Sequence, residues 1–327
     1  MRLRRSDPNR PGYGRRRCGR GMLYLDREGR PIRDPDEVRR LRELVIPPAW
    51  REVWISPHPA GHIQATGIDA AGRKQYLYHP LWRARQDEAK FDHVLEVAAR
   101  LPQLRARVAA HLAARGLGRE RVLAAVTRLL DLGAFRVGND QYAAGDDPTY
   151  GVSTLRPEHL RSRPGCVIFE FPAKGGIALT RRVDDPQLCG VLRQLRRRRR
   201  AAERLFGYWA GRSWRDVRSD EINDYLRESS GGEMTAKDFR TWRATLLAAT
   251  RLAALGPQPS ATARKRAVAG TMREVAAELG NTPAVARASY VDPRVVDLYH
   301  DGALTRVRPD AAEADLERSV LRLLAER

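Results

Sequence analysis

The period of the hydrophobic pattern changes at about residue 91. Before that point, apolar residues come in short β-prone runs such as Met22 to Leu25 and Val53 to Ile55. After it, they recur at every third or fourth position, which is the spacing of one face of an α-helix. A chain of 327 residues is also longer than the roughly 250 residues at which single hydrophobic cores stop growing. We therefore predict an α+β protein with a small β-rich domain over residues 21–90 and a larger, mainly helical domain over 91–327.

The last two β-prone runs of the first part, residues 62–67 and 74–78, predict a hairpin. Alternation along its second strand places Tyr76 and Tyr78 on one face and Gln75 on the other. Ordinary packing within a sheet explains two tyrosines in this arrangement, so the pattern alone assigns them no function.

Two further β-prone runs, Cys166 to Phe171 and Ile177 to Val183, interrupt the helical part of the chain. The residues between them, Pro172 to Gly176, include Lys174 and two glycines, a composition typical of a turn. We expect a β-hairpin within the helical domain, with Lys174 at its tip. Because the chain has only five lysines beside 55 arginines, a lysine at this place is notable.

A helix is predicted to begin after Thr235, because Thr235 and Asp238 have the spacing of a capping box. Lys237 and Arg240 are three residues apart and share an edge of its first turns. Farther along, a short helix is predicted to end at Tyr290. At a helix end this side chain can be presented to a ligand rather than buried.

The chain is strongly basic, with a formal net charge of +20 and a pI of about 10.8. A field of this sign attracts polyanions, which makes nucleic acid the leading partner. The arginine run at 196–200 is typical of a solvated helix face, and we assign it no role. Residues 1–20 contain eight arginines and few apolar side chains, and this composition predicts a flexible basic arm.

Other classes of protein are disfavoured by what the sequence lacks. No stretch approaches the ~20 apolar residues of a membrane span, and the N-terminus resembles no secretion signal, so we expect a cytoplasmic protein without membrane contact. Cys18, Cys166 and Cys189 contain no C-x-x-C pair, so we expect neither a disulfide nor a metal site. The sequence also has no phosphate-binding G-x-x-x-x-G-K-[ST] loop.

Several of these residues occur in the order and spacing of a known family. The blocks in the second part of the chain are Arg136-Val137-Gly138-Asn139 with Tyr142, Lys174 in the hairpin, Lys237-x-x-Arg240, and Gly280-Asn281-Thr282-Pro283 followed by Ser289-Tyr290. The blocks in the first part are Ile46-Pro47-Pro48-Ala49-Trp50, Gly61 to Gly67 and Gly72 to Tyr78. The chain thus resembles, over about residues 22–300, the type IB DNA topoisomerases, and in particular their small poxvirus-like and bacterial branch.

The resemblance implies a reaction and a fold. Members of this family cut one strand of duplex DNA by attack of a tyrosine oxygen on a phosphodiester, which forms a 3′-phosphotyrosyl bond and releases a 5′-hydroxyl. The strand rotates and the hydroxyl then reverses the attack. Because the covalent intermediate conserves the bond energy, the resemblance implies that supercoils relax without ATP, a metal ion or a redox cofactor. The fold implied is a C-shaped clamp of two domains on double-stranded DNA, and we expect a monomer associated with the nucleoid.

The resemblance also assigns catalytic roles. Tyr290 matches the nucleophile, and Arg136 and Arg240 match two arginines whose fixed charge and paired donors suit the negative non-bridging oxygens of the transition state. Lys174 matches the general acid for the leaving 5′-oxygen, since neighbouring cations can lower the pKa of a lysine far more readily than arginine gives up its proton. Asn281 stands where poxvirus members carry a histidine, and its amide donates a hydrogen bond without supplying charge.

Another group of residues lies near DNA in similar proteins. It contains Tyr142 and the pair Tyr76 and Tyr78, for which aromatic packing is the alternative explanation. Gln75 is a candidate for reading a base edge in the major groove. Lys237 is a candidate for binding phosphate or for assisting the general acid.

Two other functions compete with this interpretation. A tyrosine recombinase shares the catalytic logic, but recombinases usually carry H-x-x-R where this chain has Lys237-Asp238-Phe239-Arg240, and their N-terminal domain is helical. A non-enzymatic chromosomal DNA-binding protein would explain the charge alone. We expect a topoisomerase.

Overall fold

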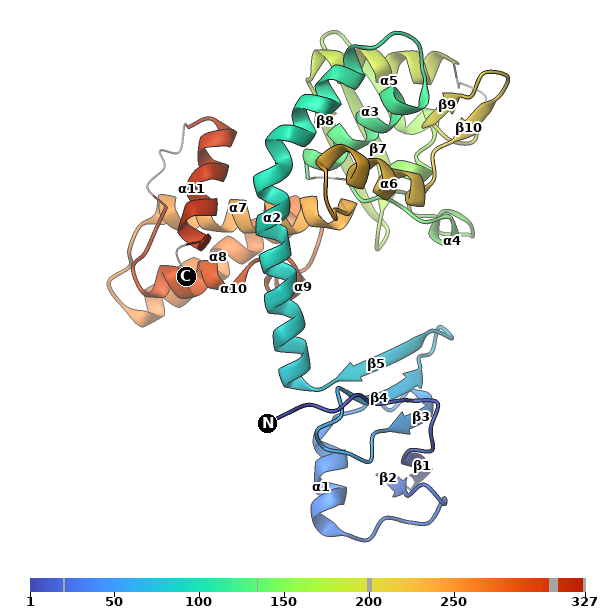
Figure 1. Ribbon diagram of the computed structural model, residues 1–327, viewed down its shortest axis with the longest axis vertical. Coiled ribbons are helices and arrows are strands. Elements are labelled where there is room, and N and C mark those ends of the chain that lie inside the picture. The colour runs from blue at the N-terminus through green and yellow to red at the C-terminus, as the bar shows by residue number, and fades with distance from the viewer. Residues whose placement is uncertain (20, 134, 199–201, 306–310, 326–327) are drawn as a thin grey trace. The chain divides into compact units, whose positions relative to one another are not determined.

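The computed structural model describes the chain except for residues 20, 134, 199–201, 306–310 and 326–327. It divides into two compact units, Met1–Phe91 and Asp92–Arg327, drawn in Figure 1. In the described ranges, no helix is both long enough and apolar enough to cross a membrane. The predicted α+β class, with a β-rich first part and a mainly helical second part, is confirmed.

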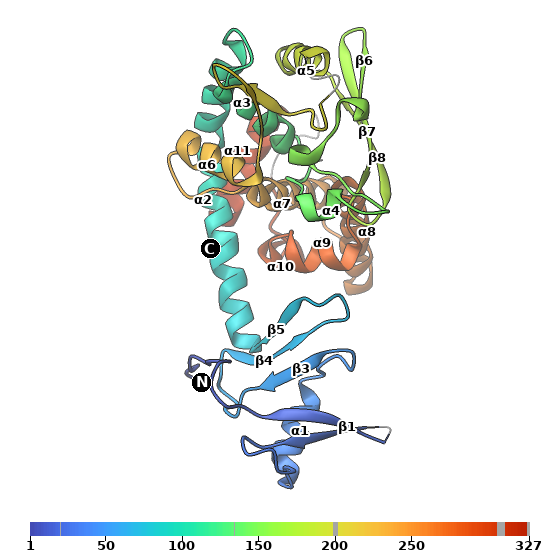
Figure 2. The same cartoon turned by 90° about the vertical axis from the view of Figure 1, so that its right-hand side faces the viewer.

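In its described residues, the first unit contains two small antiparallel sheets, one short helix and the first turns of a long helix that continues into the second unit (Figure 2). Their bounds are β1 Gly14–Cys18, β2 Gly21–Leu25, α1 Pro35–Glu43, β3 Arg51–Ile55, β4 Ile63–Ile68 and β5 Lys74–Tyr78. Strands β3, β4 and β5 pair in that order, so β5 is an edge strand, and β1 pairs with β2. Side chains from α1, β3 and β4, namely Leu41, Ile55 and Ala65, are completely buried and form the core of this unit.

The N-terminal segment is not the flexible arm that its composition predicts. Tyr13 forms an antiparallel bridge with Ile55, and the backbone N–H of Arg4 donates to the carbonyl of Ala60. The guanidinium of Arg15, within β1, donates to the carbonyl of Ile46 at 2.7 Å. Since these partners lie some thirty to sixty residues away along the chain, the local excess of arginine could not reveal them.

The second unit is mainly helical and, in its described residues, contains a three-stranded antiparallel sheet and a two-stranded hairpin. Helix α2, Pro80–Ala113, begins in the first unit and continues into the second. The other elements are α3 Arg119–Asp131, α4 Asp140–Ala143, β6 Leu160–Arg163, β7 Cys166–Ala173, β8 Ile177–Val183, α5 Pro186–Arg198, β9 Gly207–Trp209, β10 Trp214–Asp216, α6 Ser219–Ser230, α7 Ala236–Leu255, α8 Ala261–Leu279, α9 Pro283–Ser289, α10 Pro293–His300 and α11 Glu313–Ala325. Two short 3₁₀ turns, Val152–Thr154 and Pro157–His159, lie between α4 and β6.

Helix α2 starts eleven residues before the helical pattern of the sequence. Its first residue is Pro80, which suits the first position of a helix because that position needs no N–H donor. The turns that follow are rich in charged residues and carry no continuous apolar stripe, so hydrophobic periodicity could not detect them.

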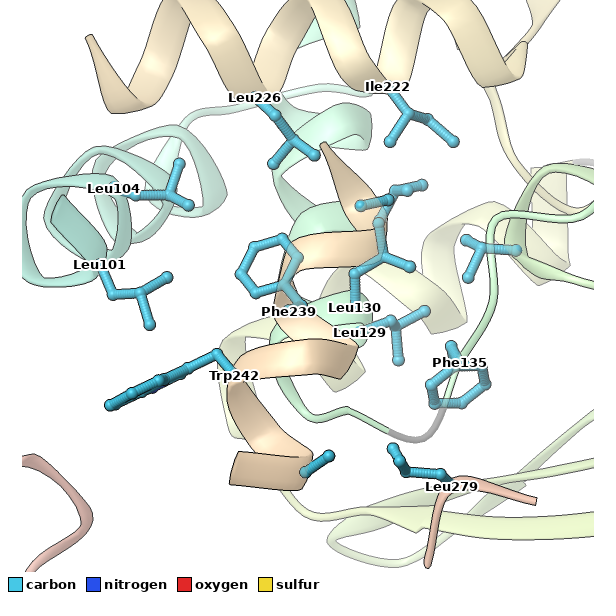
Figure 3. Close-up of a cluster of buried hydrophobic side chains, with 14 of the residues drawn as sticks. Leu101, Leu104, Leu129, Leu130, Phe135, Ile222, Leu226, Phe239, Trp242 and Leu279 are labelled. Carbon is cyan, nitrogen blue, oxygen red and sulfur yellow. The ribbon is translucent and has the colours of Figure 1, made fainter. Parts of the chain in front are cut away.

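Helix α7 is at the centre of the second unit, where it packs against α3, α6, α8, α10 and α11. Figure 3 shows the buried side chains around it: Leu101 and Leu104 of α2, Leu129 and Leu130 of α3, Ile222 and Leu226 of α6, Phe239 and Trp242 of α7, and Leu279 of α8. An element held from so many sides is rigid, because displacing it would open cavities in the core. Functional groups on the first turns of α7 are therefore precisely placed relative to α8.

The predicted hairpin in the helical domain is present. Strands β7 and β8 pair antiparallel through seven register positions, from Val167 opposite Val183 to Ala173 opposite Ile177. The turn between them is Lys174 with two glycines whose φ angles are 85° and 73°, a backbone conformation that favours glycine. Of the arginine run at 196–200, the first three residues form the last turn of α5, and the last two lie outside the described residues.

Candidate active site

The candidate site is built around the C-terminal end of α8. This helix ends at Leu279, and Gly280 takes a left-handed conformation with φ 60° that turns the chain out of the helix. Thr282 then caps α9 by accepting a hydrogen bond from the N–H of Val285. Asn281 therefore lies in a short connection that is fixed on both sides.

Arg240 reaches this connection from α7. The helix begins at a capping box, in which the backbone N–H and the hydroxyl of Thr235 both donate to Asp238. One turn later, Arg240 is 4% exposed, and its Nη2 donates to the carbonyl of Leu279 at 2.7 Å. Its Nε and Nη1 are buried and have no hydrogen-bond partner in the described part of the chain. A buried donor without a partner is unfavourable, so these two N–H groups are available for a ligand.

Arg136 approaches from the segment between α3 and α4. Its Nη2 donates to the carbonyl of Gly280 at 3.0 Å and to Oδ1 of Asn281 at 2.7 Å. Its own backbone carbonyl accepts from the N–H of Val152 at 2.8 Å. The side chain and the backbone of Arg136 are thus both held.

The hydrogen bond from Arg136 orients the side-chain amide of Asn281. Because Oδ1 accepts from Arg136, the amide nitrogen Nδ2 faces away from it. Nδ2 is buried and has no hydrogen-bond partner among the described residues. The amide is therefore a further unused donor beside the two of Arg240.

Tyr290 ends α9, with its backbone N–H donating to the carbonyl of Ala286. The guanidinium carbon of Arg240 lies 5.3 Å from the centroid of the phenol ring. The hydroxyl of Thr245, on α7, donates to the carbonyl of Tyr290 at 3.3 Å and accepts from the N–H of Asp292 at 3.1 Å. Helix α7 thus positions both the ring and the backbone of this tyrosine.

The charges around the phenol change its acidity. Burial acts to raise the pKa of Tyr290, but the positive charges of Arg240, Arg136 and Lys237 outweigh it and lower that pKa below its ordinary value. Burial and the neighbouring charge of Arg136 in turn lower the pKa of Arg240. These surroundings destabilise further positive charge and stabilise a phenolate. The site is therefore suited to an anionic ligand and a tyrosine nucleophile.

Lys174 has a different environment from these four residues. It is exposed at the tip of the β7–β8 hairpin, and no hydrogen bond or ion pair of its side chain occurs within the described ranges. The structure therefore brings Arg136, Arg240, Asn281 and Tyr290 together, with Lys237 close enough to affect the phenol. It does not place Lys174 in contact with them.

The residues predicted to contact DNA lie in both units. Tyr76 and Tyr78 stack with ring centroids 6.1 Å apart on the exposed face of edge strand β5. Gln75 faces the other side, and its Nε2 donates to Asp69 at 2.9 Å. Tyr142, on the single turn α4 of the second unit, is also exposed.

Sequence reasoning missed two residues that support the site, Thr245 and Gly151, and a third residue at the end of α8, Arg181, whose Nη2 donates to the carbonyl of Glu278 at 2.9 Å. Gly151 lies directly against Gly138, and a Cβ atom at position 151 would be 2.3 Å from the Gly138 nitrogen. The block that begins at Arg136 contains Gly138, but nothing local shows that a second glycine thirteen residues later must face it. Arg181 is one of many arginines in the sequence, and only its tertiary contact distinguishes it.

In the described residues, no cluster of three or more His, Cys, Asp or Glu side chains has the arrangement of a metal site. The three cysteines carry free thiols.

Comparison with known proteins identifies the family. Residues 79–302 match the family model described as the catalytic core of eukaryotic DNA topoisomerase I, and residues 21–69 match the N-terminal domain of bacterial DNA topoisomerase IB. The chain is also 28% identical over 301 residues to the DNA topoisomerase 1B of Acanthamoeba polyphaga mimivirus, covering 89% of this chain and 88% of that protein.

A helical unit in which a tyrosine at a helix end lies beside two arginines has the arrangement predicted for a DNA strand transferase of the tyrosine class. The family match extends over more than half of the chain, and the chain belongs to the type IB DNA topoisomerases. These enzymes relax supercoiled DNA by cutting and rejoining one strand, and the function predicted from the sequence is confirmed.

Proposed function

We propose that Tyr290 is the nucleophile of this topoisomerase and that Arg136, Arg240 and Asn281 bind the scissile phosphate of double-stranded DNA. The observation that carries the proposal is the set of buried donors without partners, Nε and Nη1 of Arg240 and Nδ2 of Asn281, beside a phenol of lowered pKa. A phosphodiester has two non-bridging oxygens that accept such hydrogen bonds, and their negative charge grows in the transition state.

In the reaction, the phenolic proton is lost to water and the Tyr290 oxygen attacks phosphorus. The bond from phosphorus to the 5′-oxygen breaks, and Lys174 gives a proton to that oxygen as it leaves. The products are a 3′-phosphotyrosyl bond and a 5′-hydroxyl, and religation is the same sequence reversed.

Asn281 takes the place of the histidine of poxvirus enzymes as an uncharged donor. Its carbonyl oxygen is occupied by Arg136, so only its N–H group is available to a phosphate oxygen. In this proposal, Arg136 binds phosphate itself and also orients the amide N–H of Asn281. Removing Arg136 is expected to weaken phosphate binding by Arg136 and by Asn281.

The first unit is proposed to be a DNA-binding domain and the second a catalytic domain, with the boundary near residue 91. The exposed ring faces of Tyr76 and Tyr78, with the ammonium of Lys74 5.8 Å from the Tyr76 ring, offer stacking and charge to DNA. Tyr142 offers a further aromatic contact from the catalytic unit. Gln75 is bound to Asp69, so reading a base requires that it exchange this partner. We propose that the enzyme works as a monomer on chromosomal DNA.

The test is relaxation of a supercoiled plasmid by the full chain in EDTA without ATP. Tyr290→Phe is expected to reduce relaxation by more than ~10³-fold and to form no detergent-trapped covalent adduct, because the attacking oxygen is absent. DNA binding is expected to persist, since both arginines remain.

Tyr150→Phe is the matched control, because this buried ring packs on His159 and its hydroxyl makes no hydrogen bond within the described ranges. Its relaxation is expected to equal that of the wild type. Relaxation by Tyr290→Phe at the wild-type rate would show that another group attacks phosphorus.

A further inference from the structure

The C-terminal end of α8 binds a third guanidinium besides the two of the proposed catalytic arginines. Arg181, on β8, donates from Nη2 to the carbonyl of Glu278 at 2.9 Å, across 97 residues of sequence. Three consecutive carbonyl oxygens are thus each bound by an arginine: Glu278 by Arg181, Leu279 by Arg240, and Gly280 by Arg136. The contact between Arg181 and the carbonyl of Glu278 has no role in the proposed mechanism.

The end of a helix explains why guanidinium groups gather there. The last carbonyls of an α-helix have no partner within the helix and form the negative end of its dipole. In α8, the N–H groups of Gly280 and Asn281 bond back to the carbonyls of Ala276 and Ala277. The next three carbonyls remain for donors from outside the helix, and these donors come from three different parts of the fold.

Arg181 is well placed to control the hairpin that carries Lys174. It lies on the half-buried face of β8 with Leu179 and Val183, seven residues after Lys174. The other strand is held separately, since the carbonyl of Pro172 on β7 accepts from the N–H of Tyr150 at 2.9 Å. Arg181 is the corresponding attachment of β8, and it connects this strand to the same helix end that binds the phosphate-binding arginines.

The surroundings of Arg181 indicate positioning rather than general stabilisation. Its Nε is buried and has no hydrogen-bond partner in the described residues, and no ion pair joins its guanidinium to a carboxylate there. A half-buried guanidinium with a buried, unused Nε–H stabilises the fold less well than an apolar side chain of similar volume would. What an apolar side chain could not provide is the contact with the Glu278 carbonyl.

We propose that Arg181 is a positioning residue that holds the β7–β8 hairpin at the end of α8 and thereby keeps Lys174 within reach of the leaving 5′-oxygen. This inference rests on the proposed role of Lys174 as general acid. Without the Arg181 contact, the phosphate would still bind to Arg136, Arg240 and Asn281, and Tyr290 would still attack. Proton delivery to the leaving group would become slow.

The test compares two DNA duplexes in single-turnover cleavage. One has the ordinary 5′-oxygen at the scissile bond, and the other has sulfur in its place, which leaves as a thiolate and needs no proton. Arg181→Met is expected to cleave the oxygen substrate about tenfold to a hundredfold more slowly than the wild type. This loss is smaller than the loss expected when the general acid itself is removed, because Lys174 remains. It is expected to cleave the sulfur substrate at a rate within about threefold of the wild type. The ratio of the two rates is independent of how much of the variant is folded.

Two further variants sharpen the comparison. Arg181→Lys retains a donor for the Glu278 carbonyl and is expected to recover most of the oxygen rate. Arg182→Met is the matched control, because Arg182 lies on the exposed face of β8 and pairs with Asp184, and both of its rates are expected to equal those of the wild type.

The outcomes separate this inference from the function on which it rests. If Arg181→Met slows both substrates equally, Arg181 supports the fold or the phosphate site, and the positioning role is wrong. If the sulfur substrate restores the cleavage rate of Lys174→Ala but not that of Arg181→Met, only the role of Arg181 is overturned. If sulfur fails to restore Lys174→Ala, the general-acid assignment is wrong, and the positioning role with it.

Discussion

The partners of individual arginine side chains distinguish structural arginines from those of the candidate site. Arg105 of α2 donates to Asp131 and to Glu317, which also accepts from the indole of Trp242, so its charge is neutralised within the protein. Arg136 and Arg240 instead bond to carbonyl oxygens and an amide, and in the described residues neither forms an ion pair with a carboxylate. Their charge is therefore not compensated and remains available to an anion. In a chain with 55 arginines, this difference in partners is more informative than the charge itself.

The acidity of Tyr290 provides a test at the residue scale. Its pKa lies below the ordinary value because the charges of Arg240, Arg136 and Lys237 outweigh burial, so removing one cation must raise it. Arg240→Gln is expected to raise the pKa of Tyr290, and the phenolate will then form only at higher pH. The measurement is an ultraviolet titration of phenolate, taken as the difference between each protein and the same protein carrying Tyr290→Phe.

The control for this titration is Arg251→Gln, which removes an exposed arginine of the same helix that pairs with Glu274. It is expected to leave the titration of Tyr290 unchanged. A Tyr290 pKa that does not move in Arg240→Gln would show that Arg240 is not what makes the phenol acidic.

At the scale of elements, the position of Arg136 depends on a close contact between two backbone segments. Gly138 has φ 92°, and the backbone of Gly151 lies against it. The N–H groups of Val152 and Ser153 donate to the carbonyls of Arg136 and Val137 at 2.8 and 2.7 Å. The segment that carries the arginine is therefore held like a short strand pair, which only glycine at position 151 allows.

Gly151→Ala is expected to displace this segment. The added Cβ would lie 2.3 Å from the Gly138 nitrogen and 2.7 Å from the Arg136 carbonyl, and backbone atoms cannot move aside without shifting Arg136. We expect a free energy of unfolding lower by about 2 kcal/mol and single-turnover cleavage slower by at least ~10-fold, measured by denaturant unfolding and gel assay.

Gly190→Ala is the matched control, since a Cβ at this position in α5 meets no atom within 4 Å. Alanine favours a helix over glycine by up to ~1 kcal/mol, so this variant is expected to be as stable as the wild type or more so, with unchanged cleavage. Normal cleavage by Gly151→Ala would mean that Arg136 does not depend on the contact with Gly138.

For the whole molecule, the net charge of +20 predicts how binding to DNA depends on salt. Each phosphate that the protein neutralises releases bound counterions, so affinity falls as salt rises. For six or more phosphate contacts, we expect a loss of roughly 10³-fold between about 50 and 200 mM salt, measured by fluorescence anisotropy on a duplex.

The slope of the logarithm of affinity against the logarithm of salt concentration is expected to be the same for Tyr290→Phe as for the wild type, because this variant leaves every cation in place. Arg136→Met is expected to reduce the slope by about one phosphate contact. An affinity that does not change with salt would show that phosphate contacts do not dominate binding.

Much of the architecture follows from local patterns. The turn glycines predict the hairpin with Lys174 at its tip, and the spacing of Thr235 and Asp238 predicts the start of α7; both are present. The start of α2 at Pro80 and the fixed N-terminal segment were not predicted. The partners of the N-terminal segment lie elsewhere in the fold, and the first turns of α2 carry no continuous apolar stripe, so hydrophobic periodicity and local composition reveal neither feature.

The sequence by itself determined which residues are candidates: Tyr290, Arg136, Arg240 and Asn281 follow from order and spacing, and so does the family. Their catalytic roles stay predictions until the variants are measured. Only the tertiary structure decided which N–H groups are left without partners, which arginines lack a carboxylate, and that Arg181 meets the end of α8. The reason is physical: spacing along a chain specifies helices, strands and turns, but burial and the pairing of charges depend on segments that come together only when the chain folds.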